Sequence, residues 1–287
     1  MLNTITVKEN AELMKYLLGN LPGKNRDNIK SLLKYRQISV NGHIVTAFNH
    51  PLNVGDQIEV AKDKIPVEKD YSGFSIVFED AHIIVIDKHA GVLSVSDDRD
   101  KTLTAFRMLS AHVRKARAGN KLFVVHRLDR DTSGLMMFAK SPIVQERLQE
   151  NWKEAVTERT YLALVEGKVE DPKGRIRSYL KENSALMVFS SQDPSQGQLA
   201  ITRYELLKQS NDYSLLKVNL ETGRKNQIRV HLQEIGHSIV GDKKYGAQSN
   251  PIARLGLHAW VLAFVHPITN EPMRFQTNIP RKFLRLF

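Results

Sequence analysis

The most informative absence in the 287-residue sequence is that of cysteine. Without cysteine the chain can form no disulfide, no thiolate nucleophile and no cysteine-ligated zinc site. Long apolar runs are also absent, since no stretch approaches the roughly 20 apolar residues that a membrane-spanning helix needs. The N-terminal segment lacks the basic start and apolar run of a secretory signal. These absences predict a soluble, cytoplasmic protein that makes no contact with a membrane.

Basic residues outnumber acidic ones: the sequence has 42 Lys and Arg and 31 Asp and Glu, which gives a formal net charge of +11. The excess is concentrated: residues 101–128 hold seven basic residues and no acid, and residues 24–36 hold five basic residues and one acid. Clustered positive charge favours a polyanionic partner, of which nucleic acid is the commonest. The alternative is a solvated basic surface that binds nothing.

A polar stretch at residues 61–72, without apolar periodicity, separates two parts of the sequence. We expect a small domain over residues 1–62, a linker over residues 63–73 and a large domain over residues 74–287. The small domain reads as two short helices followed by short strands, a small α/β module. The large domain reads as successive strands with short connections and a few helices. That order is typical of an α+β fold with a mainly antiparallel mixed sheet and flanking helices.

Apolar spacing places several helices in this scheme. Leu13, Leu17 and Leu18 are expected to share the buried face of a first helix. In the large domain, helices are predicted over residues 102–119 and over residues 141–152, the second with Ser141 as its N-cap.

Three polar clusters interrupt apolar segments: HRLDRDTSG (126–134), ERTY (158–161) and ETGRKNQIRVH (221–231). Asp129 lies between apolar flanks, where a carboxylate is costly to bury unless a cation accompanies it. Arg229 is the natural cation, on a helix that follows a glycine turn. The pair is either an active-site feature or an ordinary buried ion pair.

Other motifs of catalysis are missing. HRLD lacks the asparagine and the glycine-rich loop that accompany a kinase catalytic loop. The chain also lacks a Gly-x-Ser-x-Gly elbow, a Walker lysine and zinc-type histidine spacing. A carboxylate in basic surroundings remains, working without metal or redox cofactor. On nucleic acid, such a group suits attack at a sugar or base carbon.

The clusters strongly resemble the motifs of the RluA-type pseudouridine synthases. Five segments match in the order of that family, over roughly residues 74–280: DKHAGVLSV (87–95), HRLDRDTSGLMMFAK (126–140), RTYLALVEG (159–167), TGRKNQIRVHLQEIGHSIVGDKKYG (222–246) and LHAWVLAFVHPITNEPMRF (257–275). The small domain resembles the RNA-binding domain first described in a small-subunit ribosomal protein. In that domain the expected RNA contacts are Arg26, Lys30, Lys34 and Asn41.

The resemblance implies a role for each matching residue. Asp129 corresponds to the carboxylate that attacks the uridine, at the anomeric carbon of the sugar or at the ring. Arg127 corresponds to the residue that fills the space left by the flipped nucleotide. Tyr161 corresponds to the tyrosine that stacks under the base and assists proton removal, and Arg229 to the arginine paired with the aspartate. Further expected RNA contacts are His126, Thr132 and Arg224.

Two positions depart from the family pattern, which usually has histidine where this chain has Asn226 and proline where it has His89. We expect these departures to alter local packing or RNA contacts and not to remove the activity.

The sequence thus predicts an RNA pseudouridine synthase that acts on structured RNA by base flipping, with large-subunit ribosomal RNA as the expected target. No metal and no cofactor is expected, and the resemblance favours a monomer. The alternatives are a transfer-RNA pseudouridine synthase, a glycosylase that releases the base, and an RNA-binding ribosome-assembly factor whose modification activity is secondary.

Overall fold

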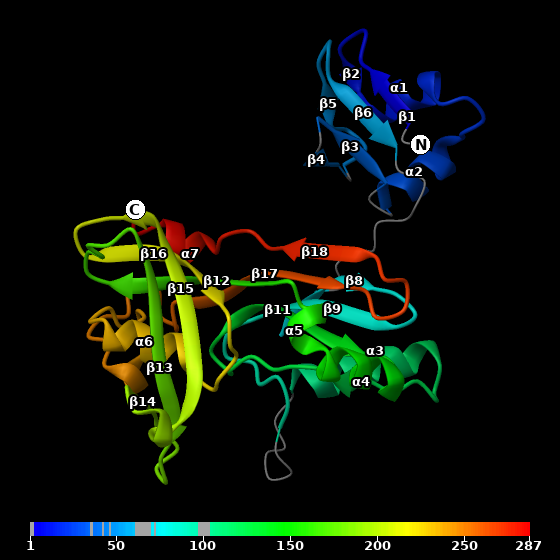
Figure 1. Ribbon diagram of the computed structural model, residues 1–287. Helices are drawn as coiled ribbons and strands as arrows, with labels where there is room; N and C mark the ends of the chain where they lie inside the picture. Colours follow the sequence, from blue (N-terminus) through cyan, green and yellow to red (C-terminus); the bar gives the residue numbers. More distant parts are fainter. Residues whose placement is uncertain are drawn as a thin grey trace. The chain divides into compact units, whose positions relative to one another are not determined.

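The computed structural model describes residues 3–34, 37–41, 43–45, 47–60, 70–71, 73–96 and 104–287. The chain divides into two compact units, Met1–Lys69 and Asp70–Phe287, each with its own hydrophobic core (Figure 1). The expected linker at 63–73 lies largely outside the described residues. Its boundaries, and the RNA-binding role of the first unit, therefore stay predictions.

The first unit combines two helices with two small antiparallel sheets, ordered β1-β6-β3-β4 and β2-β5. Leu13 and Leu17 are buried as expected, but Leu18 is 42% exposed, and its predicted place in the core is wrong. Leu18 follows Leu13 by five positions, which places it about 140° away around an α-helix. The elements are α1 (Leu13–Asn20), α2 (Arg26–Lys34), β1 (Asn3–Thr6), β2 (Ala11–Glu12), β3 (Ile38–Val40), β4 (His43–Ile44), β5 (Pro51–Leu52) and β6 (Gln57–Val60).

The second unit is built on one twelve-stranded sheet, ordered β14-β13-β15-β16-β12-β17-β11-β9-β8-β7, with β10 paired to β11 and β18 to β17. Of these pairs, only β11 with β17 is parallel, which confirms the mainly antiparallel mixed sheet of an α+β fold. The strands are β7 (Asp70–Tyr71), β8 (Phe74–Glu79), β9 (Ile83–Lys88), β10 (Phe123–Val124), β11 (Ser133–Ala139), β12 (Glu158–Glu166), β13 (Lys173–Glu182), β14 (Val188–Ser191), β15 (Gln198–Gln209), β16 (Tyr213–Leu220), β17 (Leu257–Val265) and β18 (Pro272–Gln276).

Helix α3 (Ala105–Ala116) begins after its N-cap Thr104, within the predicted range 102–119, and α4 (Pro142–Glu150) begins after its predicted N-cap Ser141. The Ser141 hydroxyl accepts the Val144 N–H with Pro142 in the first turn, but the predicted 141–152 helix ends at Glu150, and α5 starts separately at Trp152. The helices are α3 (Ala105–Ala116), α4 (Pro142–Glu150), α5 (Trp152–Ala155), α6 (Gln227–Glu234) and α7 (Arg281–Leu284), with 3-10 turns at Pro194–Gln196 and Lys243–Tyr245. None of the helices in the described part of the chain is long and apolar enough to cross a membrane.

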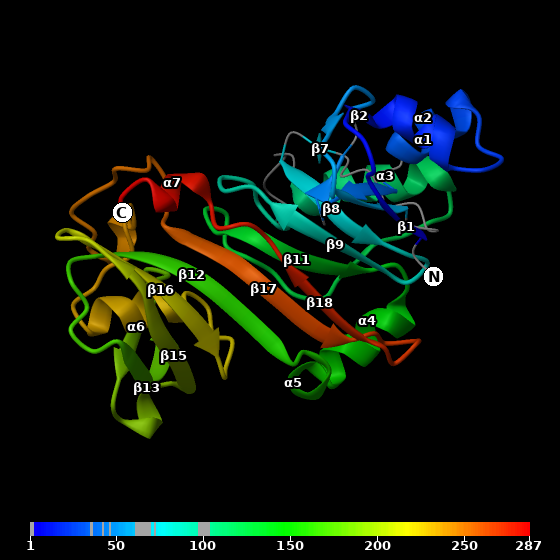
Figure 2. The same ribbon diagram turned by 90° about the horizontal axis from the view of Figure 1, so that it is seen from above.

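Strand β11 is buried along its whole length because helices cover both faces of the sheet around it. Its side chains alternate: Met136 and Phe138 pack in a cluster with α3, and Leu135 and Met137 pack in a cluster with α4. Beside it, β12 and β17 run from the end of the unit that holds α6 to the end that holds α4 (Figure 2). The chain enters β11 at Ser133, where β11 pairs with β17. The polar cluster around Asp129 lies directly before this point.

Two buried histidines, His231 and His258, are held as neutral rings between hydroxyl groups. Burial lowers the pKa of His231 to about 4 and the pKa of His258 to about 3. Each ring nitrogen lies within 2.7–3.0 Å of a hydroxyl oxygen, from Ser178 and Thr202 around His231 and from Ser133 and Thr277 around His258.

We expect the free energy of unfolding to fall as the pH is lowered from about 7 to about 4.5. In the unfolded chain these histidines take up protons near pH 6.5, whereas the folded rings stay neutral down to about pH 4 and pH 3. The unfolded state therefore binds more protons throughout this window and is favoured by acid. Urea unfolding at the two pH values measures the effect. His231→Asn should shrink the difference, and an unchanged difference would assign it to carboxylates instead.

Candidate active site

A loop, residues 125–132, leads from β10 into β11 and carries Asp129. Its backbone is fixed on both sides of the aspartate. The Ser94 hydroxyl donates to the Leu128 carbonyl oxygen at 2.7 Å and accepts the Leu128 N–H at 3.2 Å. The Thr132 N–H donates to the Asp129 carbonyl oxygen at 3.2 Å. The loop is therefore a rigid turn that projects the Asp129 side chain.

Lys88, at the end of β9, supports the same loop from inside the protein. Its side chain is fully buried, and its ammonium donates at 2.8–3.0 Å to the carbonyl oxygens of His89, Val92 and Arg130. Burial lowers the pKa of Lys88 to about 8, although nearby aspartates oppose that shift. Sequence reasoning missed this residue, because the DKHAGVLSV motif does not reveal that its lysine turns back towards a loop some forty positions away.

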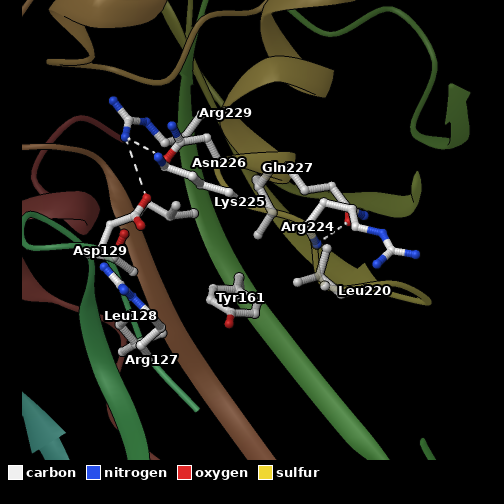
Figure 3. A pocket seen from close by; sticks show the side chains of 14 residues that line it. Arg127, Leu128, Asp129, Tyr161, Leu220, Arg224, Lys225, Asn226, Gln227 and Arg229 are labelled. Carbon is white, nitrogen blue, oxygen red and sulfur yellow. Dashed lines mark hydrogen bonds and ion pairs between the residues drawn. The ribbon is translucent and has the colours of Figure 1, made fainter. Parts of the chain in front are cut away.

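A hollow of about 430 Å³ opens beside the loop, and we call it the catalytic hollow (Figure 3). Arg127 and Asp129 come from the loop, Tyr161 comes from β12, and Arg224 and Arg229 come from the turn and helix on the opposite side. The structure thus brings together six of the predicted site residues: Arg127, Asp129, Thr132, Tyr161, Arg224 and Arg229.

Asp129 and Arg229 face each other across 100 positions of sequence, as the cost of burying a carboxylate predicted. The contact is long, with Nη1 of Arg229 3.5 Å from Oδ2 of Asp129. The Asp129 side chain keeps 36% of its surface exposed, against 14% for Arg229. A carboxylate that is held near a cation and still open to solvent can reach a bound substrate.

The principal partner of Arg229 is Asp242, which the sequence analysis did not single out. Nε and Nη2 of Arg229 each donate to a different Asp242 oxygen at 2.7 Å, and the Asp242 side chain is only 1% exposed. Burial lowers the pKa of Arg229, but the hydrogen bonds and charge of Asp242 more than offset it and leave that pKa raised. The Tyr245 ring lies 4.8 Å beneath the guanidinium. Only Nη1 is left to face Asp129.

Tyr161 follows a bulge in β12, where the pairing with β17 shifts between Thr160 and Tyr161. Its ring lines the catalytic hollow next to Asp129. Burial raises the pKa of the Tyr161 hydroxyl, although the nearby Arg159 charge opposes that shift. The phenol is therefore protonated at neutral pH and offers a stacking surface and one hydrogen-bond donor.

The hollow thus combines a reachable carboxylate, a fixed cation and an aromatic face. A family model described as RNA pseudouridylate synthase matches residues 82–234, which include the loop, Tyr161 and Arg229.

The chain belongs to the RNA pseudouridine synthase family.

Relatives match the synthase over nearly its whole length. It is 32% identical to the RNA pseudouridine synthase YhcT of Bacillus subtilis (strain 168) over 272 residues, which cover 93% of this chain and 89% of that protein. It is 29% identical to "Ribosomal large subunit pseudouridine synthase D" of Pasteurella multocida (strain Pm70), over 92% of this chain and 86% of that protein. The synthase is therefore an isomerase that modifies RNA.

Solved structures support the assignment of the fold. Human RNA pseudouridylate synthase domain containing 1 superposes with a TM-score of 0.58 at 26% identity, over 75% of this chain and 87% of that chain. Human RNA pseudouridylate synthase domain containing 4 has a TM-score of 0.60 at 21% identity, over 73% and 90% of the two chains, and shows the fold alone.

Both departures from the family pattern make local contacts in the synthase. Asn226 adopts a left-handed backbone with φ of 54°, which asparagine tolerates better than most residues. Its side-chain oxygen accepts a hydrogen bond from Arg229 at 3.1 Å, and its amide donates to the Tyr245 hydroxyl at 3.0 Å. The His89 N–H donates to the Gly73 carbonyl oxygen at 2.9 Å, a bond that proline could not make.

The remaining predicted contacts lie elsewhere. Nε2 of His126 accepts the Met137 N–H of β11 at 3.0 Å, its ring packs against Trp152, and burial lowers its pKa to about 4, so this histidine fastens the loop and does not line the catalytic hollow. In the first unit, Arg26 and Lys30 are exposed on α2, Lys34 ends that helix, and the Asn41 side chain bonds to Asp56 and to the Gln57 N–H. Their RNA contacts stay predictions.

Proposed function

We propose that the synthase isomerises specific uridines in structured RNA, with Asp129 as the nucleophile and large-subunit ribosomal RNA as the target. The observation that carries this proposal is the half-exposed Asp129 carboxylate, which opens onto the catalytic hollow between Arg229 and Tyr161. Nothing in the reaction calls for a metal or a cofactor, because isomerisation leaves the oxidation state of the uridine unchanged.

In the proposed reaction a uridine leaves its stack and enters the catalytic hollow, at a cost of a few kcal/mol. Arg127 fills the space left in the RNA, and Tyr161 stacks against the base, an interaction worth about 1–3 kcal/mol. Asp129 attacks the anomeric carbon of the sugar or the ring, and the glycosidic bond to N1 breaks. The base turns, C5 bonds to the anomeric carbon, and the bond to Asp129 breaks again. The proton on C5 passes to the freed Asp129 carboxylate or to water, assisted by Tyr161, and N1 takes up a proton. Arg229 faces the Asp129 carboxylate and orients it.

Support for a ribosomal target comes from the relatives and from charge. The alignment with the relative named "Ribosomal large subunit pseudouridine synthase D" covers 92% of this chain, so it includes much of the first unit. We assign residues 1–62 to RNA binding through Arg26, Lys30, Lys34 and Asn41, residues 63–73 to a linker and residues 74–287 to catalysis. Thr132 and Arg224 would contact the RNA at the catalytic unit, whereas His126 fastens the loop from inside the protein. We infer a monomer that works in the cytoplasm.

The proposed function is tested by tritium release from RNA labelled at C5 of uridine, with ribosomal and transfer RNA assayed separately. The hydrogen on C5 leaves when C5 joins the sugar, so release reports isomerisation. We expect release from ribosomal RNA, followed by mapping of the modified uridines. Release from transfer RNA alone would mean that the target is transfer RNA and not ribosomal RNA. Free uracil in the product would indicate a glycosylase. No release would favour a binding role in ribosome assembly.

Charge reversal on α2 should weaken RNA binding and flatten its salt dependence. Arg26 and Lys30 are exposed on this helix. Each phosphate contact removed by the substitutions should reduce by about 1 the slope of the logarithm of the RNA association constant against the logarithm of the salt concentration. The measurement is RNA affinity between about 50 and 200 mM salt for native protein and for Arg26→Glu with Lys30→Glu. An unchanged slope would mean that α2 does not lie on RNA.

A further inference from the structure

A second hollow, of about 420 Å³, lies against the catalytic hollow and shares Gly223 and Arg224 with it. We call it the flanking hollow. It is formed by the C-terminal end of α4, by α5, by the start of β12 and by the turn before α6. Its lining residues that matter here are Glu150, Trp152, Glu154, Arg159, Gly223 and Arg224. The proposed chemistry of Asp129 makes no use of this space.

The floor of the flanking hollow is a stack of planar groups. The guanidinium carbon of Arg159 lies 5.8 Å from the centre of the Trp152 ring, and both side chains are half-buried. Gly223 permits this arrangement, since a Cβ there would lie 2.7 Å from Nη1 of Arg159. Unpaired nucleobases stack on indole rings and on guanidinium planes. The floor therefore offers a stacking surface next to the place where the uridine would be held.

The wall of the flanking hollow is tied to the Asp129 loop. The Gln149 amide donates to the Val124 and Val125 carbonyl oxygens at 3.1 and 3.2 Å. The Trp152 ring lies 5.1 Å from the His126 ring. A group bound in the flanking hollow would thus be held at a fixed distance from Asp129.

The charges around the hollow fit a base and not a phosphate. Three carboxylates line it. Glu150 and Glu154 are exposed at its edge, where they would repel a phosphate, and Glu221 forms ion pairs with Arg175 and Arg203. A carboxylate accepts hydrogen bonds only. Guanine presents two adjacent donors, N1–H and the N2 amine, and on its other edge it presents the acceptors O6 and N7, which arginine binds. Cytosine offers a carboxylate only a single amine. Uracil and adenine match this combination of carboxylates and arginine less well than guanine does.

We propose that the flanking hollow binds a guanine adjacent to the uridine that enters the catalytic hollow. The guanine stacks on Arg159 and Trp152, its donor edge faces Glu150 or Glu154, and its acceptor edge faces Arg224. This assignment rests on the proposed function, because that function makes the neighbouring base a uridine. It makes the flanking hollow a determinant of which uridines are chosen.

The test is binding of fluorescently labelled pentanucleotides that differ only in the middle base: UUGUU, UUAUU, UUCUU and UUUUU. Binding is measured by anisotropy on the full-length protein. We expect UUGUU to bind about tenfold more tightly than the others. In Glu150→Gln with Glu154→Gln, we expect the four affinities to converge to within about twofold. Each substitution removes a charge without removing volume.

A matched control, Glu146→Gln with Glu170→Gln, removes the same charge from exposed positions that line neither hollow. If the acids act only through general repulsion of RNA, both double variants tighten binding of all four RNAs equally. Equal affinities for the native protein, or a guanine preference that survives Glu150→Gln with Glu154→Gln, would overturn the proposal. A guanine preference without tritium release would instead rule out the proposed function. Tritium release without a guanine preference would rule out only the guanine site in the flanking hollow.

Discussion

Asp129→Asn is expected to lower the rate of pseudouridine formation by about four orders of magnitude or more, as loss of a catalytic nucleophile commonly does. The amide has nearly the shape of the carboxylate but carries no negative charge with which to attack carbon. Its oxygen can still accept from Nη1 of Arg229, which lies only 3.5 Å away in the native protein. The loop is fixed by its backbone through Ser94 and Lys88, so the variant should fold and bind RNA normally.

The measurement is tritium release together with RNA affinity, on one preparation of each protein. Asp131→Asn is the matched control, because Asp131 lies in the same loop and pairs with Arg130 at the surface. We expect the control to retain native activity to within a few-fold. Substantial release by Asp129→Asn would show that the nucleophile is another group. Lost RNA binding in that variant would point to a role of Asp129 in holding substrate.

The sequence predicted those parts of the site that depend on local pattern. Asp129, Tyr161 and Arg229 each lie in a polar cluster between apolar flanks, and the cost of burying a carboxylate was enough to suggest the pairing of Asp129 with Arg229. Strand β11 forms the apolar segment that follows the first of these clusters. Ser141 was recognised as an N-cap because capping depends on three neighbouring residues only.

The parts that escaped prediction depend on contacts between distant segments. Asp242 lies 13 positions after Arg229 and binds it in a two-pronged contact, and no periodicity reports that geometry. The ammonium of Lys88 serves a loop carbonyl 42 positions away. Strand β13 alternates between exposed and buried residues over much of its length and carries five charged residues, so its sequence resembles a polar connection. Leu18 was misplaced because it lies about 140° around the helix from Leu13, on the exposed side.

The position of Arg229 between two aspartates explains why its contact with Asp129 is loose. Asp242 occupies Nε and Nη2, and the Asn226 side chain shares Nη1. Much of the guanidinium charge is therefore already neutralised when Asp129 meets it. A carboxylate in a tight bidentate pair with arginine is a poor nucleophile, because its electron pairs are engaged. The arrangement holds a cation 3.5 Å from Asp129 and leaves the carboxylate oxygens available to a substrate.

Asp242→Asn should therefore lower kcat about 100-fold while leaving RNA affinity within a few-fold of native, since an arginine that misplaces a catalytic group commonly costs this much. The asparagine amide turns a donor towards Arg229, so the guanidinium loses a buried partner, a change that costs about 3–5 kcal/mol in comparable pairs. Arg229 is then free to form a two-pronged contact with Asp129.

Two readouts separate this effect from simple loss of stability. If Arg229 clamps Asp129, kcat stays low at every temperature at which the variant is folded. If Asp242 only supports the fold, the melting temperature falls while kcat recovers on cooling. Asn226→Ala serves as the comparison, because it frees Nη1 of Arg229 but leaves the pair with Asp242 closed. We expect that variant to lose less than about tenfold in kcat, because the contact with Asp242 that positions Arg229 stays closed. The two hydrogen bonds lost with the Asn226 side chain, and alanine in a left-handed backbone, lower stability instead.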